Sequence, residues 1–218
     1  MKRILIYGAT GRTGHLALTY ALNQGYAVTA LVRNPAKLTL QSPHLAVVGG
    51  LPTNLADVRR AMQGCDYVIS TLSALPEADS FSRRKIAPPH TLETTMRHTI
   101  TVMGELGLRR VVTLSSIGVG DSHSFAPWYM RLMIRLTNFR LVFADHQAQE
   151  TLLRQSGLEW VIARPVALND KETTRQLVVR YGQRPTPFTI SRRQLAKFMV
   201  DALVGDDFVR QAPLLAEG

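Results

Sequence analysis

The sequence predicts an α/β fold in which a doubly wound parallel sheet carries helices on both faces. Short runs rich in β-branched residues alternate with longer helical runs from residue 2 to residue 163, which is typical of repeated strand–helix units. The first apolar run, at 4–7, ends abruptly in glycine, as a strand buried on both faces does. Right-handed crossovers between such strands give the doubly wound arrangement.

The first half of the chain accounts for four strands and two helices. Gly25 follows a helical run as a C-terminal cap does, and the segment after it alternates and is rich in β-branched residues. Thr53 or Asn54 precedes the next helical run as an N-cap, and Gly64 lies beyond its end. The expected elements are strands at 4–7, 26–32, 45–48 and 67–71 and helices at 15–22 and 54–62.

Two long helical runs separate the remaining core strands. Gly107 ends the first run and Gly157 follows the second. The polar, proline-marked segment 75–89 between strand and helix has a length usually associated with function. The expected elements are helices at 90–106 and 128–155, the second broken near Asn138, and strands at 111–114 and 158–163.

The tail of the chain departs from this alternation. We expect a strand at 176–180, a rigid turn at 185–187 and a helix at 191–203 that Ser191 caps. These elements are too few for an independent domain. We therefore expect a single domain over 1–218, with the doubly wound core at 1–165 and a small α/β lobe at 166–218 on the substrate side.

Length and composition describe an ordinary globular chain. With 218 residues, 45% of them apolar and 19% charged, the chain can bury roughly 70% of its unfolded surface in one domain. No apolar run is long enough to span a bilayer, so we expect neither an export signal nor a membrane partner. Cys65 is the only cysteine, which excludes an intrachain disulfide and fits a cytoplasmic location.

The net charge of +10 favours anionic partners. The basic residues are nevertheless scattered in pairs and triplets, and the sequence has no nucleic-acid-binding motif, so we do not expect nucleic-acid binding. No cluster of histidine, aspartate or glutamate has metal-ligand spacing, and we expect no metal site.

Gly8, Gly11 and Gly14 follow the first strand with a spacing of three. Glycines allow a tight turn and let the backbone approach a phosphate, while the next helix supplies unpaired N–H groups at its positive end. The spacing differs from the standard G-x-G-x-x-G fingerprint, and a purely structural turn is the alternative. Its place at the start of a strand–helix–strand unit favours a site for a dinucleotide diphosphate.

The end of the second strand predicts which dinucleotide binds. An NAD site usually places an acid there for the ribose 2′-hydroxyl, but this chain has Arg33 instead, with Lys37 shortly after it and Arg12 inside the glycine loop. Guanidinium groups match a 2′-phosphate, which a carboxylate would repel. We therefore predict NADP(H) as the cofactor, the alternative being three ordinary surface cations.

Ligands in a doubly wound sheet lie beyond the carboxyl ends of the strands. We therefore expect the residues at the ends of three strands to face the nicotinamide half of the cofactor, namely Ser70, Thr71, Leu72, Ser73, Ser115, Ser116, Arg164, Pro165 and Val166. A serine hydroxyl here could position the carboxamide or a substrate oxygen, or it could satisfy local backbone groups. The local role fits Ser115 slightly better, and we assign the catalytic position to Ser116.

Several segments resemble one known family. Residues 6–14 (IYGATGRTG), 111–116 (VVTLSS) and 162–165 (IARP) are similar to the atypical short-chain dehydrogenase/reductases, within the NmrA-like and biliverdin-IXβ reductase/flavin reductase branch. The resemblance runs nearly end to end. It implies a Rossmann-like fold, Ser116 near the hydride-transfer centre, and an NADPH site formed by Gly8, Thr10, Gly11, Arg12, Thr13, Arg33 and Lys37.

The chain lacks the tyrosine–lysine pair that many of these enzymes use. Tyr20, Tyr67 and Tyr129 are each followed four residues later by a residue other than lysine, so protonation of a carbonyl by an activated tyrosine is not supported. We predict an NADPH-dependent reductase of a planar acceptor, a flavin or a biliverdin-like tetrapyrrole, that acts as a monomer or weak homodimer. The expected pocket walls are Leu72, Leu75, Ile117, Phe125, Trp128 and Val166. The alternative is an NmrA-like redox sensor or assembly factor that binds NADP(H) without turnover.

Overall fold

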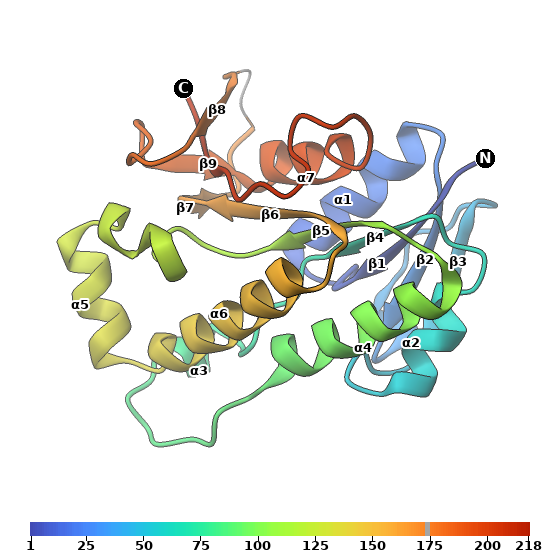
Figure 1. Cartoon of the computed structure of the whole chain (residues 1–218), viewed down its shortest axis with the longest axis horizontal. Helices are drawn as coiled ribbons and strands as arrows, with labels where there is room; N and C mark the ends of the chain where they lie inside the picture. Colours follow the sequence, from blue (N-terminus) through green and yellow to red (C-terminus); the bar gives the residue numbers. More distant parts are fainter. Residues whose placement is uncertain (173–174) are drawn as a thin grey trace.

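A mostly parallel sheet crosses the molecule (Figure 1). Within residues 1–172 and 175–218, which the computed structural model describes, eight strands form this sheet in the order β3-β2-β1-β4-β5-β6-β10-β8. β8 runs antiparallel to β10, and the other neighbouring pairs are parallel. The predicted doubly wound α/β fold is confirmed. The strands are β1 (Arg3–Tyr7), β2 (Ala27–Val32), β3 (Leu45–Gly49), β4 (Tyr67–Ser70), β5 (Arg110–Leu114), β6 (Glu159–Pro165), β8 (Leu177–Arg180) and β10 (Leu214–Glu217).

Helices cover both faces of the sheet (Figure 1). Successive side chains of a strand point to opposite faces, so Ile4 and Ile6 join one core while Leu5 and Tyr7 join the other. All four are fully buried, as predicted for this strand. The first core is covered by α1 (Arg12–Asn23) and α7 (Arg192–Asp201), and the second by α2 (Leu55–Met62), α4 (Thr91–Leu106) and α6 (Phe139–Gln155).

Helix α1 begins three residues earlier than the helix expected at 15–22, because Arg12, Thr13 and Gly14 form its first turn. A glycine inside a helix lowers helix propensity, which conceals this turn in the sequence. Short elements at the carboxyl edge were also not predicted as such. They are α3 (Glu77–Phe81), the 3-10 helices η1 (Pro35–Lys37) and η2 (Gly120–Phe125), and the paired strands β7 (Ala167–Asn169) and β9 (Thr189–Ser191).

The helical region expected at 128–155 is divided into α5 (Trp128–Leu136) and α6 by Thr137 and Asn138, which confirms the predicted break. The buried Asn138 side-chain amide donates to the carbonyl oxygens of Asp79 at 3.1 Å and Arg84 at 2.9 Å. The break therefore serves as an anchor for the segment between α3 and α4. Figure 1 shows α5 at the end of the molecule farthest from β3.

The last part of the chain is joined to the sheet. β10 lies between β6 and β8, and α7 packs along α1. The Ser191 hydroxyl accepts from the N–H of Gln194 at 3.1 Å, which confirms the predicted cap. The division of the domain into a doubly wound core at 1–165 and a small lobe at 166–218 stays a prediction. No helix in the described part of the chain has both the length and the apolar character needed to cross a membrane.

Candidate functional site

The glycine loop makes a tight turn directly after β1. Gly8 has a φ of +80°, in the left-handed region that favours glycine, and its carbonyl accepts from the N–H of Gly11 at 2.9 Å. A Cβ on Gly14 would lie 2.0 Å from the carbonyl oxygen of Gly8. No side chain fits there, so the first turn of α1 is pressed against the end of β1.

This turn leaves the beginning of α1 available to an anion. Its N-cap is Gly11, which has no side chain to cap the helix, and the first turn contains no acidic residue. The first N–H groups of a helix have no intrahelical acceptor, and they carry the positive end of its dipole. The glycine loop has no room for added side chains, and the helix after it begins without a side-chain cap. These two features fit the binding of a dinucleotide diphosphate.

Thr71 supports the glycine loop from the neighbouring strand. Its hydroxyl donates to the carbonyl oxygen of Tyr7 at 2.9 Å, and a Cβ on Gly14 would lie 2.6 Å from the same hydroxyl oxygen. The residue thus ties the ends of β1 and β4 together beneath the loop. Thr71 was expected to face the nicotinamide half of the cofactor, and its support of the glycine loop was not foreseen.

Arg33 and Lys37 follow β2 at the carboxyl edge of the sheet. Because β2 is paired in parallel with β1, the end of β2 brings Arg33 to the same sheet edge as Gly8. Both side chains are exposed, and neither forms an ion pair in the described part of the chain. Asn34 fixes the turn between them by accepting from the N–H of Ala36 at 3.1 Å. Among the described residues, two cations without an ion pair therefore follow β2 at this edge of the sheet.

The loop after β3 has no acid of its own, but α2 supplies one. The N–H of Leu51 donates to the Asp57 carboxylate at 2.9 Å, and Arg60 donates to the carbonyl oxygen of Gly49 at 2.7 Å. The hydrogen bond from Leu51, followed by contact with Arg60, lowers the pKa of Asp57 below its usual value despite some desolvation. This loop is therefore held next to η1.

Arg12 points away from Arg33 and Lys37. Its guanidinium pairs with Glu77 at 2.7 Å and with Asp170 at 3.3 Å, on the side of β4 and β7. Asp170 also pairs with Arg192 at 2.7 Å. The expected group of three cations therefore does not include Arg12, and the assignment of Arg33 and Lys37 to the ribose stays a prediction. Arg12 instead links the glycine loop to α3 and to the segment after β7, and sequence spacing did not indicate its acidic partners.

Two predicted residues follow β4. Leu72 is half-buried and packs against the core beneath α4 and α6. Ser73 is exposed, and its hydroxyl donates to the carbonyl oxygen of Leu75 at 2.9 Å. Leu72 can therefore form part of a wall at the carboxyl edge, whereas Ser73 stabilises the turn that leads to α3.

The two serines after β5 have different surroundings. Ser115 is buried, and its hydroxyl donates to the Glu150 carboxylate at 2.6 Å. The local backbone bond considered for Ser115 is thus replaced by a contact with α6. Ser116 is half-buried, and its hydroxyl donates to the carbonyl oxygen of Ile117, the next residue, at 3.1 Å. A hydroxyl with only this partner can turn toward a ligand. The geometry therefore favours Ser116 over Ser115 as the residue that contacts the reactants.

Glu150 and Arg164 form a buried ion pair behind these serines. Arg164 Nε donates to Glu150 at 3.0 Å, and its terminal nitrogen donates to Asp121 at 2.6 Å. Burial works against the charge of Arg164, but the carboxylates of Glu150 and Asp121 outweigh it and raise its pKa. Arg164 was expected to face the nicotinamide. The structure places it in this support network instead.

Pro165 and Val166 close the end of β6. The carbonyl of Pro165 accepts from the N–H of Ile117 at 3.1 Å, and the N–H of Val166 donates to Leu215 at 3.0 Å. Val166 belongs to the core under α1 and α7. Of the other expected walls, Ile117 is fully buried and Trp128 is 69% exposed, so Trp128 does not line an enclosed pocket.

A cavity of about 400 Å³ lies beside the glycine loop. Thr10, Gly11, Arg12 and His15 line one side, and Asp170, Lys171, Glu172, Arg192 and Arg193 line the other. A larger hollow of about 540 Å³ lies at the amino ends of β4, β5 and β6, around Tyr67, Arg110 and Glu159. Because ligands of doubly wound sheets bind at the carboxyl ends, the smaller cavity marks the candidate site.

The histidine on α6 is not a proton donor near neutral pH. His146 on α6 is buried, and burial lowers its pKa to about 4 although Asp145 works in the opposite direction. It is therefore neutral near pH 7. Among the described residues, no group of three or more histidine, cysteine, aspartate or glutamate side chains could hold a metal ion.

Comparison with known proteins agrees with this geometry. A family model described as NAD(P)H-binding matches residues 8–206. An uncharacterised chloroplastic protein of Arabidopsis thaliana is 26% identical over 214 residues, which cover 94% of this chain and 73% of that protein.

Solved structures share the fold. ChuY of Escherichia coli O157:H7, described as an anaerobillin reductase, has a TM-score of 0.80 at 21% identity, with 99% of this chain and 97% of that chain covered. A short-chain dehydrogenase/reductase of Veillonella parvula DSM 2008, solved in complex with NADP, has a TM-score of 0.77 at 18% identity, with 99% and 94% covered.

Proposed function

The chain belongs to the NAD(P)H-binding family, and on that premise we propose that it is a reductase that passes hydride from NADPH to a planar acceptor, a flavin or a linear tetrapyrrole. The cofactor choice rests on Arg33 and Lys37 at the end of β2, which form no ion pair with any residue that the structure describes. Arg33 and Lys37 stand there without an acid, and a guanidinium matches a phosphate better than a ribose hydroxyl.

The residues of this chain would act by binding and positioning. The glycine loop and the first turn of α1 hold the diphosphate, and Arg33 with Lys37 holds the 2′-phosphate. Ser116 lies at the end of β5, where its hydroxyl can orient the carboxamide or an oxygen of the acceptor. NADPH, when bound, supplies the hydride, and a planar acceptor held against its nicotinamide can take a proton from solvent.

Two observations support a planar acceptor. The sequence has no tyrosine–lysine pair, and Glu150, a buried acid at the carboxyl edge, is held by Ser115 and Arg164, whereas flavin and tetrapyrrole reduction needs little acid catalysis by the protein. The likeness to ChuY, a reductase by its description, is in line with a tetrapyrrole, although that likeness is one of fold.

Turnover tests the proposal. Purified protein is mixed with NADPH and either FMN or biliverdin, and the nicotinamide absorbance band is followed. Gly14→Ala serves as the control, because its added Cβ would collide with the glycine loop. Steady oxidation of NADPH that depends on the acceptor and is lost in the control supports a reductase. Absence of oxidation with both acceptors, under conditions where NADPH binds, contradicts it.

The second candidate is a sensor or assembly factor that binds NADP(H) without turnover. The lack of a tyrosine–lysine pair in the sequence favours it equally. In this case titration shows NADPH binding, and a change in shape or in partner binding follows without oxidation. A cytoplasmic location also stays a prediction; the Arabidopsis relative is described as chloroplastic.

A further inference from the structure

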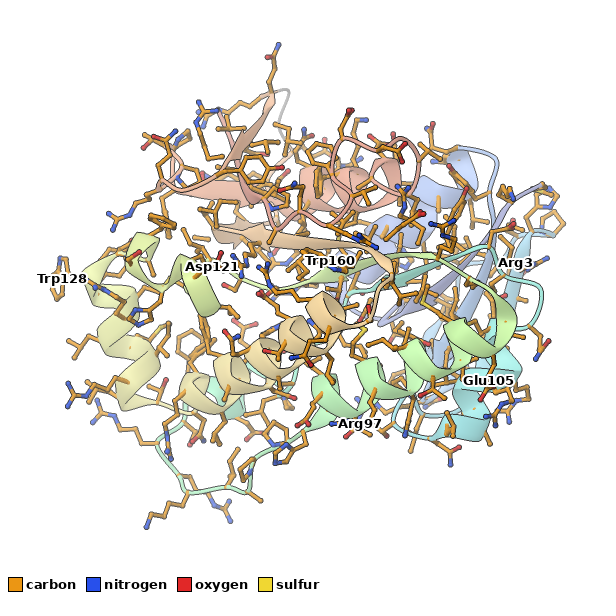
Figure 2. The ribbon with its side chains drawn as sticks, in the orientation of Figure 1. Arg3, Arg97, Glu105, Asp121, Trp128 and Trp160 are labelled. Atoms are coloured by element: carbon orange, nitrogen blue, oxygen red, sulfur yellow. The ribbon has the colours of Figure 1, made fainter. Side chains whose placement is uncertain are left out.

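Helix α5 exposes an apolar stripe at one end of the molecule. Trp128, Leu132 and Leu136 are spaced by four residues and therefore share one helix face, and Tyr129 lies beside them. These four side chains are 69%, 47%, 48% and 56% exposed, in that order. Figure 2 shows Trp128 pointing away from the body of the protein.

The opposite face of α5 accounts for its attachment to the body. Met130 packs against the core beneath α1 and α7, and Ile134 faces Gly118, where a Cβ would lie 3.9 Å from its terminal carbon. Arg184 donates to the carbonyl oxygen of Phe125 at 2.7 Å, just before the helix. The helix is thus held by one face, and the apolar stripe is left without a partner in the described part of the chain.

Basic side chains surround the stripe. Arg131 and Arg135 flank it on α5, and Arg140 follows on α6. The segment with Arg83, Arg84 and Lys85 is brought to the end of α5 by Asn138, whose side chain binds the carbonyl oxygen of Arg84 at 2.9 Å. All six cations are exposed, and none forms an ion pair among residues 1–172 and 175–218.

We propose that α5 and its basic surroundings dock the protein onto an anionic lipid surface. A short helix with tryptophan and leucine on one face and arginine beside them is suited to lie in the headgroup region, with the apolar side chains inserted and the cations over the anionic lipid. Tryptophan and tyrosine are the side chains enriched at that depth.

The charges around α5 favour an anionic lipid surface over a second copy of the chain as the binding partner. A symmetric contact through α5 would bring two sets of six unpaired cations together, whereas an anionic leaflet neutralises them. The expectation of no membrane partner came from the absence of a spanning run, and an interfacial helix does not need one. Since α5 follows β5 and η2, docking would hold the carboxyl edge of the sheet near the lipid.

Vesicle binding tests the proposal. The full chain is sedimented with phosphatidylcholine vesicles that contain or lack phosphatidylglycerol, and tryptophan fluorescence is recorded. The protein has two tryptophans, and Trp160 is buried beneath Arg154, so a blue shift reports Trp128. We expect sedimentation and a blue shift only with phosphatidylglycerol. Absence of binding to both vesicle types overturns the proposal.

Matched variants localise the contact. Trp128→Ser with Leu132→Ser should abolish sedimentation, while Val204→Ser, an exposed apolar residue elsewhere, should not. Arg131→Gln with Arg135→Gln should weaken binding by roughly tenfold or more, because each cation near an anionic leaflet contributes about fivefold. Arg97→Gln with Arg109→Gln removes the same charge elsewhere and should have a smaller effect.

Two results contradict this assignment. Equal binding by the α5 variants and their controls would show that net charge alone attracts the protein. A dimer of the unmodified chain in solution that Trp128→Ser with Leu132→Ser dissociates, in the absence of lipid, would show that the stripe is an interface between copies. Circular dichroism and NADPH titration confirm that each variant is folded.

Discussion

Gly14 on α1 and Gly8 at the end of β1 approach so closely that a Cβ on Gly14 would lie 2.0 Å from the carbonyl oxygen of Gly8. This contact brings the uncapped beginning of α1 to the carboxyl edge of the sheet. It also explains the position of Thr71, whose hydroxyl fills the space beneath both glycines. The cofactor site therefore depends on backbone packing before any charged side chain contributes.

Replacement of Gly14 by alanine should displace the loop. We expect Gly14→Ala to lower the free energy of unfolding by about 1–3 kcal/mol, as overpacking does, and to weaken NADPH binding by roughly tenfold or more. Chemical denaturation and isothermal titration measure the two effects. Gly104→Ala is the control, because nothing lies within 4 Å of a Cβ there and alanine favours the helix. Unchanged NADPH binding by Gly14→Ala would contradict the role of the contact.

Arg33→Glu should change cofactor selectivity. The variant replaces a charge-assisted contact with repulsion at the 2′-phosphate, so NADPH binding should weaken by about 2–3 kcal/mol while NADH binding changes little. Titration with both cofactors measures the difference. Arg97→Glu reverses a charge on α4, away from the carboxyl-edge loops, and should leave the ratio unchanged. Equal losses for NADPH and NADH in Arg33→Glu would mean that Arg33 does not bind the 2′-phosphate.

Removal of the Ser116 hydroxyl should affect catalysis, whereas removal of the Ser115 hydroxyl should affect stability. Ser116→Ala should lower kcat by roughly two- to tenfold, the value of one hydrogen bond, and leave the melting temperature unchanged. Ser115→Ala removes a donor to the buried Glu150 and should cost about 1–3 kcal/mol of stability. Steady-state kinetics and thermal unfolding of both variants test this. A kinetic defect in Ser115→Ala alone would reverse the assignment.

His146 should make stability depend on pH. Burial lowers the pKa of His146 from 6.5 to about 4, so between these values the unfolded chain binds a proton that the folded chain does not. Stability is therefore retained above pH 6.5 and lost as pH falls toward 4, by roughly 3 kcal/mol in total.

Denaturation of the unmodified protein and of His146→Leu across this range isolates the contribution. The variant should lose less stability on acidification. Parallel pH profiles for the two proteins would show that His146 is not buried in its neutral form.

Local patterns predicted the part of the fold that depends on neighbouring residues. The alternation of strands and helices, the glycine spacing, the Ser191 cap and the break near Asn138 all follow from short-range propensity and turn chemistry. The short strands β7, β9 and β10 were not predicted, because their pairing depends on partners distant in the sequence.

The contacts of charged side chains could not be predicted from spacing. Arg12 was expected beside Arg33, yet it pairs with Glu77 and Asp170, which are 65 and 158 residues away. Arg164 was expected at the nicotinamide and is held by Glu150 and Asp121. In the same way, the sequence of α5 contains apolar residues suited to a core, but it does not show which of its faces the fold covers.

A structure of the protein grown with NADP⁺ tests the central claim most directly. The account predicts the diphosphate at the first N–H groups of α1, next to Gly8 and Gly11, and the 2′-phosphate in contact with the Arg33 guanidinium. A dinucleotide bound elsewhere, or one whose 2′-phosphate lies away from Arg33, would contradict it.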